Sequence, residues 1–464
     1  MLRFYFEKLV GYDGLNLLTC REQNGLNPRV GVSPIASTML RQVKSNPVLN
    51  KPYPQIVDIK YAPTYGNFKF IMPISVGPAP WLWSGPDSKG NGGNPENPNH
   101  KNLFSFINPS MLELLRNKQG FFLIDQTHEG YHAPWLFDWF HTSCQDYGIP
   151  PSQIMYFTGD IEAEERYRQW AEAHNVPPDM LVVGWPHFEF AIYEVSRGYT
   201  EFGLPHPGKI VMRKLPDFDY QMAFKKFNPP AIQTFNILQK RTRPHRLWFY
   251  KYLHDADLIR DNLVSMNKFT WQESYNEGKS IAPEDAERLN LTLPLMPLEH
   301  PENYGRSNFE SGDGGAYISK ISDITTLKTW CSVVSEASCS DAEGTCFISE
   351  KTFKPIACQH PFIILGSKGV LKNLRKLGYK TFYPYINEGY DELPTFERME
   401  YIVKEMRRIQ SFSIEEKFKW YYDIEGILKY NFRHFQNRAE TYVFDLYEIM
   451  INHINKNASR HTEN

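Results

Sequence analysis

The fold is decided by three neighbouring stretches of sequence: WCSVVSEAS at residues 330–338, FISEKTF at residues 347–353 and PFIILG at residues 361–366. The first and third are apolar runs of the length of a buried strand. Between them, Ser349 followed by the acidic Glu350 is typical of a helix start, and the helix should run to about Gln359. The pattern therefore predicts a strand, a loop, a helix and a parallel strand, the building unit of an α/β domain.

The same rhythm is found on both sides of this unit. In the first half we expect strands at 68–73, 121–125, 154–157 and 181–184, with helices at 109–117, 134–147 and 161–174. In the second half we expect a strand at 234–239, a helix that begins at Pro244, a strand at 379–382 and a helix over 396–409. Strands that alternate with helices predict parallel sheets.

The length of 464 residues favours two α/β domains over one. We place an N-terminal domain at 1–228, a C-terminal domain at 229–430 and a C-terminal helical segment, packing across both, at 431–464. The Pro-rich and basic stretch at 205–230 is the expected linker. Residues 77–102 and 281–315 are rich in Gly, Pro and Asn, so we expect an irregular loop and an insertion there.

The composition is that of a globular enzyme. A formal net charge of −2 does not predict a polyanion-binding surface, so any such site must be local. The start of the chain has no leader pattern and no apolar run is long enough to span a membrane, which predicts a cytoplasmic protein. Six irregularly spaced cysteines predict reduced thiols, with Cys339 and Cys346 as the pair near enough to reconsider. The aromatic content is common in proteins that stack sugars or bases.

The helix start at Ser349 is the first candidate binding site. Free backbone N–H groups and the positive end of the helix dipole favour an anionic diphosphate at such a place. Lys351 adds a full charge, and Glu350 can accept hydrogen bonds from sugar or ribose hydroxyls. The pair suits a nucleotide-sugar, while the alternative is ordinary helix-capping chemistry.

The second candidate is the basic run KRTRPHR at residues 240–246, where the expected strand gives way to a helix. If the helix begins at Pro244, Arg243 and Arg246 share one face. The planar guanidinium matches phosphate oxygens in pairs, so these arginines can bind a pyrophosphate. The alternative is a solvated basic helix start.

The stretch over residues 335–366 resembles the donor-binding region of the α1,3-fucosyltransferase family. That region reads Phe-Glu-Asn-Ser, then aromatic-Ile/Val-Thr-Glu-Lys, then a Val-Pro-Val-Val-x-Gly strand. The matching positions here are Glu336, Ser338, Phe347, Glu350, Lys351 and the strand ending at Gly366. The sequence departs from the pattern at Ser335, Ala337 and Ser349, which leaves the sugar open. The run SEKTFKPI at 349–356 also resembles glycosyltransferase-like proteins of tailed bacteriophages, a weaker likeness.

The resemblance implies a GT-B fold of two facing Rossmann-like domains, with the donor in the C-terminal domain and the acceptor opposite. It implies a UDP- or GDP-linked sugar as co-substrate and no other cofactor. By the same likeness, Arg246 meets the donor phosphates, with Arg243 as second choice. Glu336, Ser338, Phe347, Ser349, Glu350 and Lys351 complete the expected donor site.

The catalytic base is expected in the N-terminal domain, because the acceptor hydroxyl must lose its proton as it attacks the anomeric carbon. The loop DQTHEGYH at 125–132 directly follows a predicted strand, at the edge where parallel sheets bind ligands. Glu129 is the candidate base and His128 the reserve, while Asp125 caps or orients the loop. The alternative is that these side chains are structural.

No metal site is expected. Asp217-Phe218-Asp219 has the spacing of a metal-binding Asp-x-Asp, but it lies in the expected linker. His128 and His132 have helical ligand spacing in a Gly-containing loop without further ligands nearby. The chain also has no Gly-rich phosphate-binding loop with the Lys-Ser/Thr ending, which disfavours a nucleotide hydrolase.

The sequence thus predicts a glycosyltransferase, a hexosyl- or pentosyltransferase. Two acceptors stay open: the hydroxymethyl group of a modified pyrimidine in phage DNA, or a surface or lipopolysaccharide-type glycan. For DNA, the cations available to flanking phosphates are Lys225, Lys226, Arg407 and Arg408. The alternative of another class is an inactive carbohydrate- or nucleic-acid-binding protein.

Overall fold

The computed structural model describes residues 3–5, 55–57, 70–75, 102–106, 109–127, 130, 135–197, 215–239, 242–276, 278–295, 323–339, 341 and 346–459. The chain divides into two compact units. The first comprises Met1–His187 and Glu440–Asn464, and the second comprises Phe188–Ala439. The boundary expected at 228/229 falls inside the second unit, and most of the loop expected at 77–102 lies outside the described residues.

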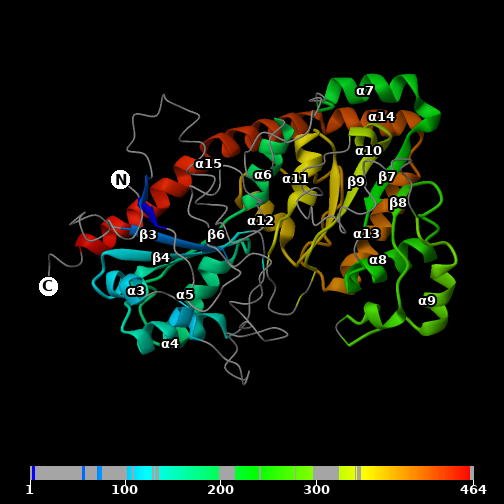
Figure 1. Ribbon diagram of the computed structural model, residues 1–464. Coiled ribbons are helices and arrows are strands. Elements are labelled where there is room, and N and C mark those ends of the chain that lie inside the picture. The colour runs from blue at the N-terminus through cyan, green and yellow to red at the C-terminus, as the bar shows by residue number, and fades with distance from the viewer. Residues whose placement is uncertain are drawn as a thin grey trace. The chain divides into compact units, whose positions relative to one another are not determined.

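The first unit is built on a six-stranded parallel sheet (Figure 1) with the order β2-β1-β3-β4-β5-β6. Its strands are β1 (Arg3–Tyr5), β2 (Gln55–Val57), β3 (Phe70–Ser75), β4 (Gly120–Gln126), β5 (Ile154–Thr158) and β6 (Leu181–Gly184). The connecting helices are η3 (Leu103–Phe106), α3 (Pro109–Arg116), α4 (Leu136–Tyr147), η4 (Pro151–Gln153) and α5 (Ala163–Ala173).

The core of the first unit forms between this sheet and the helices α4 and α5. The side chains of β4 and β5 are buried on both faces, as expected for central strands of a parallel sheet. Phe137 and Phe140 of α4 pack against Tyr167 of α5 and Tyr156 of β5, at ring centroid distances of 5.1 and 5.2 Å. These four aromatic residues therefore serve the core of the first unit.

The second unit contains a four-stranded parallel sheet with the order β10-β9-β7-β8. Its strands are β7 (Gln233–Leu238), β8 (Leu263–Ser265), β9 (Thr329–Ser335) and β10 (Phe362–Leu365). The chain leaves β7 toward β8 on one side and returns to place β9 and β10 on the other side. The strand order therefore reverses between β7 and β9, the point where ligands bind in open parallel sheets.

Helices surround this second sheet. Before β9 they are α6 (His187–Ser196), α7 (Phe218–Phe227), η5 (Pro229–Ala231), α8 (Pro244–Asp255), η6 (Trp271–Ser274), α9 (Pro283–Asn290) and α10 (Asp323–Leu327). After β9 they are α11 (Glu350–Ala357), α12 (Val370–Lys376), α13 (Thr395–Gln410), α14 (Ile414–Asp423) and α15 (Glu425–Ser459). Figure 1 shows α7 beside α14, where the rings of Phe218 and Tyr421 stack at 5.4 Å. The helix α15 contributes to both units.

The α/β class with two parallel sheets is confirmed. One local prediction is wrong. Residues 379–382 form no strand, because Asn431 bonds the backbone of Lys380 and Glu388 accepts from the backbone N–H of Phe382, at 2.8 and 2.5 Å. The insertion expected at 281–315 contains α9, while residues 296–315 lie outside the described part.

The thiols agree with the sequence analysis as far as the structure describes them. Cys144, Cys331, Cys339, Cys346 and Cys358 are buried, and no disulfide joins any two of them. Burial raises the pKa of Cys144 to about 12, so this thiol stays protonated. Among the described helices, none is long and apolar enough to cross a membrane.

Lys225 of α7 is buried in the second unit, which corrects its expected role as a contact to DNA phosphates. Its exposed fraction is 0%, and its ammonium donates to the carbonyl of Thr326 at 2.9 Å. It also lies 5.1 Å from the ring centroid of Tyr421. Burial lowers the pKa of Lys225 to about 7. A buried ammonium cannot reach a nucleic acid.

The replacement Lys225→Met should stabilise the protein by about 1 to 4 kcal/mol at pH 6, where burial of the charge is costly. In the wild type, the unfolded chain binds more protons than the folded one between pH 7 and 10, so the free energy of unfolding should rise across that window. The variant should lose this rise. Urea unfolding at several pH values measures both effects. Lys226→Met, at the exposed neighbour, is the control, and equal pH slopes in wild type and Lys225→Met would contradict the prediction.

Candidate anion-binding site of the second unit

The candidate site lies at the carboxyl ends of β7 and β9, where the strand order reverses. Strand β7 ends at Leu238 and leads through Gln239 toward α8, and β9 ends at Ser335 and leads into Glu336. The side-chain amide of Gln239 donates to the hydroxyl of Ser335 at 2.7 Å, which joins the two strand ends directly. Because both loops leave the same edge of the sheet, the described segments 242–246 and 334–339 of the two sequence motifs meet there.

Glu336 is the centre of this arrangement. Its exposed fraction is 0%, and its carboxylate accepts hydrogen bonds from the start of α11. One oxygen, Oε1, accepts from the backbone N–H of Ser349 at 3.1 Å and from the hydroxyl of Thr352 at 2.6 Å. The other, Oε2, accepts from the hydroxyl of Ser349 at 2.5 Å and from the N–H of Ala337 at 3.2 Å. Glu336 therefore fixes the end of β9 to the first turn of α11.

The first turn of α11 carries the Glu350–Lys351 pair. Ser349 is the N-cap, and its hydroxyl oxygen accepts from the N–H of Lys351. The ammonium of Lys351 donates to Glu350 at 2.5 Å and to the hydroxyl of Ser349 at 3.2 Å. The Glu350 side chain is 16% exposed and that of Lys351 is 30% exposed. Both groups thus lie partly exposed at the start of α11, and Ser349 contacts both Lys351 and Glu336.

The start of α8 supplies the second half of the site. The guanidinium of Arg246 donates to the carbonyls of Ser335 and Glu336, at 3.0 Å in both cases. Arg243 donates to the carbonyl of Ala337, and the ring of His245 lies 3.1 Å from the carbonyl of Glu336. The loop that leaves β9 is therefore held by α8 through its carbonyls and by α11 through the Glu336 side chain.

The cations at the start of α8 and at the start of α11 act on the same side chain, His245. Burial, together with the neighbouring charges of Arg246, Arg243 and Lys351, lowers the pKa of His245 to about 3. The imidazole is therefore neutral at ordinary pH. Burial on its own raises the pKa of Glu350, but Lys351 and Lys354 outweigh it and bring the pKa to about 2. Glu350 is thus ionised throughout the range in which an enzyme is assayed.

Arg243 is the cation whose charge is left for a ligand. It is half-buried, and its described contact is to a carbonyl oxygen. Within the described ranges no ion pair joins Arg243 to a carboxylate. An arginine held by a carbonyl keeps its full charge, and its remaining N–H groups can donate to phosphate oxygens in pairs.

The structure brings together most of the predicted donor-site residues. The members that meet at the two strand ends are Arg243, Arg246, Glu336, Ser349, Glu350 and Lys351. Phe347 is buried and packs edge-on against Phe188 at a ring centroid distance of 5.8 Å, so it supports the loop from beneath. Ser338 is half-buried in the same loop. Their direct contact with a ligand stays a prediction.

The predicted catalytic residues belong to the first unit. Asp125 is buried near the end of β4, and its carboxylate accepts from the N–H and the hydroxyl of Thr127, at 3.1 and 2.8 Å. Asp125 therefore shapes the turn that leads into the predicted catalytic loop. His128 and Glu129 lie outside the described residues, and their roles stay predictions.

The sequence analysis missed two polar residues of the site. Gln239 is buried at the end of β7, and its Oε1 has no partner among the described residues. His245 is buried beside Glu336. Gln239 directly follows a predicted strand, so the rule that ligands lie beyond strand ends would have marked it. For His245 no sequence signal distinguished it from its basic neighbours.

Metal ligation finds no support in the described part of the chain. No group of three or more His, Cys, Asp or Glu side chains there is arranged to hold an ion. Asp217, one half of the Asp-x-Asp stretch, is the N-cap of α7 and accepts from the N–H of Tyr220 at 2.9 Å. The spacing of this motif therefore reflects a helix start.

The fold and the site together define a two-unit α/β protein with clustered cations at a strand-order reversal. No protein-family model matches the chain, and no curated protein matches it. Among solved structures, it is similar to an α,α-trehalose-phosphate synthase (UDP-forming) from Burkholderia vietnamiensis, with 10% sequence identity and a TM-score of 0.35. The match covers 89% of this chain and 76% of that one. The similarity is too low to transfer an activity.

Replacement of Glu336 by Gln should lower the free energy of unfolding by about 2 to 4 kcal/mol, because the amide NH₂ cannot accept from buried donors. The first turn of α11 should also lose protection from amide hydrogen exchange. Urea denaturation and exchange followed by mass spectrometry measure the two effects. The matched control is Glu287→Gln on the exposed face of α9, and an equal loss in both variants would count against the assigned role.

Proposed function

We propose that the second unit binds the diphosphate of a UDP- or GDP-linked sugar and that the chain is a glycosyltransferase of the GT-B type. The observation that carries the proposal is the convergence of Arg243, Arg246 and Lys351 with the N-terminus of α11 at the reversal between β7 and β9. A diphosphate is the ligand whose charge and size fit this combination.

Each group has a role in the proposed complex. Arg243 and Lys351 contact the phosphate oxygens, and Arg246, which is buried, holds the loop and adds its charge from beneath. Glu350 accepts hydrogen bonds from ribose or sugar hydroxyls, since it stays ionised. Glu336 positions the helix start, because both of its oxygens are engaged by protein donors.

The transfer step follows from this arrangement. The acceptor oxygen attacks the anomeric carbon, the bond between that carbon and the phosphate oxygen breaks, and the nucleoside diphosphate leaves with the electron pair. The cations stabilise the negative charge that develops on the leaving diphosphate. The proton of the acceptor passes to a base, for which Glu129 stays the first candidate and His128 the second.

Lys351→Ala should weaken the binding of UDP and GDP by about 1.5 to 3 kcal/mol, because a charged contact to phosphate is lost. The unpaired Glu350 carboxylate would then repel the diphosphate, which acts in the same direction. Titration calorimetry measures the affinity. Lys404→Ala, at an exposed lysine of α13, should bind as the wild type does. Unchanged affinity in Lys351→Ala would defeat the proposal.

For the acceptor we propose the hydroxymethyl group of a modified pyrimidine in duplex DNA, with a surface glycan as the alternative. With Lys225 buried, the remaining basic candidates are Lys226, Arg407 and Arg408. Arg408 is paired with Glu405 at 2.6 Å, so Arg407 is the stronger candidate.

A gel shift on duplex DNA separates the two acceptors. If the enzyme modifies DNA, its affinity for duplex DNA should fall steeply as the salt concentration rises. In Arg407→Ala the slope of log affinity against log salt concentration should be shallower, by the amount expected for about one phosphate contact. Retention that is absent at low salt would favour the glycan. Slow release of UDP or GDP from a nucleotide-sugar would separate both enzymes from the remaining alternative, an inactive binding protein.

A further inference from the structure

The segment from Met266 to Leu295 forms a closed lobe that follows β8. Its two ends pair as an antiparallel bridge, with N–H to carbonyl distances of 3.1 and 2.9 Å in the two directions. The elements η6 and α9 lie between these ends. The lobe therefore leaves and rejoins the carboxyl edge of the sheet at one place, next to the candidate site.

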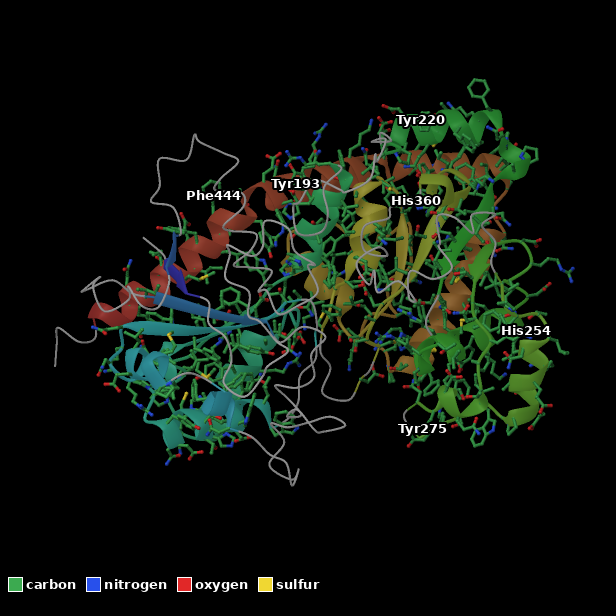
Figure 2. The ribbon with its side chains drawn as sticks, viewed as in Figure 1. Tyr193, Tyr220, His254, Tyr275, His360 and Phe444 are labelled. Carbon is green, nitrogen blue, oxygen red and sulfur yellow. The ribbon has the colours of Figure 1, made fainter. Side chains whose placement is uncertain are left out.

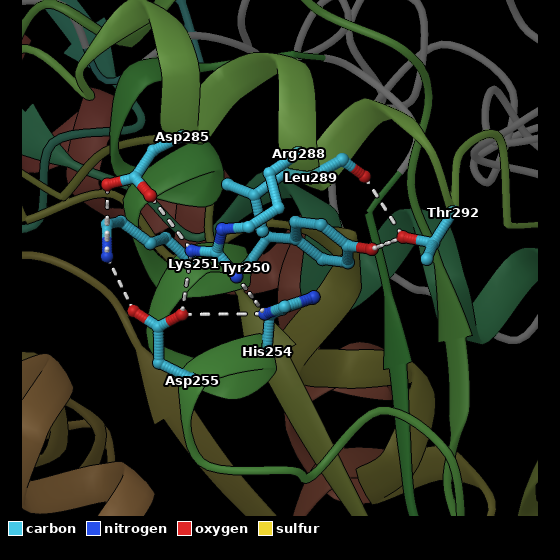
Figure 3. A network of polar contacts seen from close by, with 8 residues as sticks. All are labelled: Tyr250, Lys251, His254, Asp255, Asp285, Arg288, Leu289 and Thr292. Carbon is cyan, nitrogen blue, oxygen red and sulfur yellow. Dashed lines mark hydrogen bonds and ion pairs between the residues drawn. The ribbon is translucent and has the colours of Figure 1, made fainter.

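The lobe is fastened along the length of α8. At the start of this helix, Thr242 donates to Glu273 at 2.9 Å and the indole of Trp248 donates to the carbonyl of Ser274 at 2.9 Å. Farther along α8, a polar network joins it to α9 (Figure 3). The contacts that join the two segments are Arg288–Asp255 at 3.3 Å, Lys251–Asp285 at 3.7 Å and Tyr250–Thr292 at 3.1 Å. Lys251–Asp255 at 2.5 Å lies within α8, and Arg288–Asp285 at 2.9 Å lies within α9. The lobe is therefore attached to both ends of α8.

The lobe presents two aromatic side chains to solvent. Trp271 is 42% exposed and Tyr275 is 64% exposed. Neither ring contacts another aromatic ring in the described part of the chain. The backbone that carries them is stiff, because Thr270 and Glu273 form a capping box and the hydroxyl of Ser274 accepts from the N–H of Ile281 at 2.8 Å. An ordered backbone limits where these two rings can lie, which lowers the cost of stacking a ligand on them.

The backbone that carries the two rings is attached beside Arg243 of the cation cluster. Glu273, between Trp271 and Tyr275, contacts Thr242, the residue before Arg243. The loops after β7 and β8 also leave the sheet together, since the N–H of Gln239 lies 3.2 Å from the carbonyl of Ser265. Adjacent strands are about 4.8 Å apart, so the end of β8 is about 10 Å from the end of β9. One nucleoside spans such a distance.

We propose that Trp271 and Tyr275 form the stacking platform for the nucleobase of the donor. This inference rests on the proposed function, because the diphosphate fixes where the base can lie. The base is tethered to the diphosphate through the ribose, whereas the acceptor must approach from the sugar end. Gln272, which is exposed and follows Trp271 in the chain, offers an amide donor and acceptor to the edge of a base. The platform therefore suits a base better than an acceptor ring.

The test compares nucleotides with inorganic pyrophosphate by titration calorimetry. Trp271→Ala and Tyr275→Ala should each weaken UDP and GDP roughly 5- to 150-fold, the range expected for loss of one stacked base, and leave pyrophosphate binding unchanged. Trp271→Phe should retain most of the affinity. The control is Tyr220→Ala, a tyrosine that is 58% exposed at the opposite end of the same unit (Figure 2).

The other possible results distinguish a failure of the stacking platform from a failure of the donor site. If the wild type binds UDP or GDP and both alanine variants bind them equally well, the platform is overturned while the donor site stands. Equal losses for nucleotide and pyrophosphate would also overturn it, because the rings would then act through the folding of the lobe. If the wild type binds neither nucleotide nor pyrophosphate, the proposed function fails first and the platform with it.

Discussion

The second unit depends on the contact between the Glu336 carboxylate and the start of α11. A buried carboxylate is costly unless its oxygens are satisfied, and here the helix supplies the N–H of Ser349 and the hydroxyls of Ser349 and Thr352. The negative charge also complements the positive end of the helix dipole. Because Glu336 directly follows β9, this contact sets where α11 begins relative to the sheet. The position of Lys351 follows from it.

The same contact changes how the helix start must be understood. Glu336 already occupies the N-cap N–H, so the helix terminus alone is a weaker anion site than the sequence implies. The positive charge available to a ligand comes instead from side chains. Arg243 and Arg246 are bonded to carbonyls of residues 335–337, which orients both guanidinium groups. A carbonyl contact fixes an arginine without neutralising it, whereas a carboxylate contact would do both.

The sequence was sufficient where local patterns are strong. The apolar runs that became β4, β5, β7, β9 and β10 were predicted within one or two residues, and so was the start of α8 at Pro244. The strand predicted at 379–382 does not form, because the side chains of Asn431 and Glu388 accept hydrogen bonds from the backbone N–H groups of that segment. The meeting of Arg246 with Glu336 is likewise a long-range contact, and only the resemblance placed them in one site. The burial of Lys225 was not predicted, because a lysine in a sequence is expected at the surface.

The lobe after β8 shows what such long-range contacts add. The insertion expected at 281–315 overlaps only its second half. Its interior is ordered by Ile281 and Leu289, which are buried, and by the network with α8. Stability alone accounts for these inward residues. The parts of Trp271 and Tyr275 that stay in water, 42% and 64% of their surface, contribute little to folding. An ordered lobe with its apolar rings turned to water, one strand from a cluster of cations, has the composition of a binding surface for a ring that carries a phosphate.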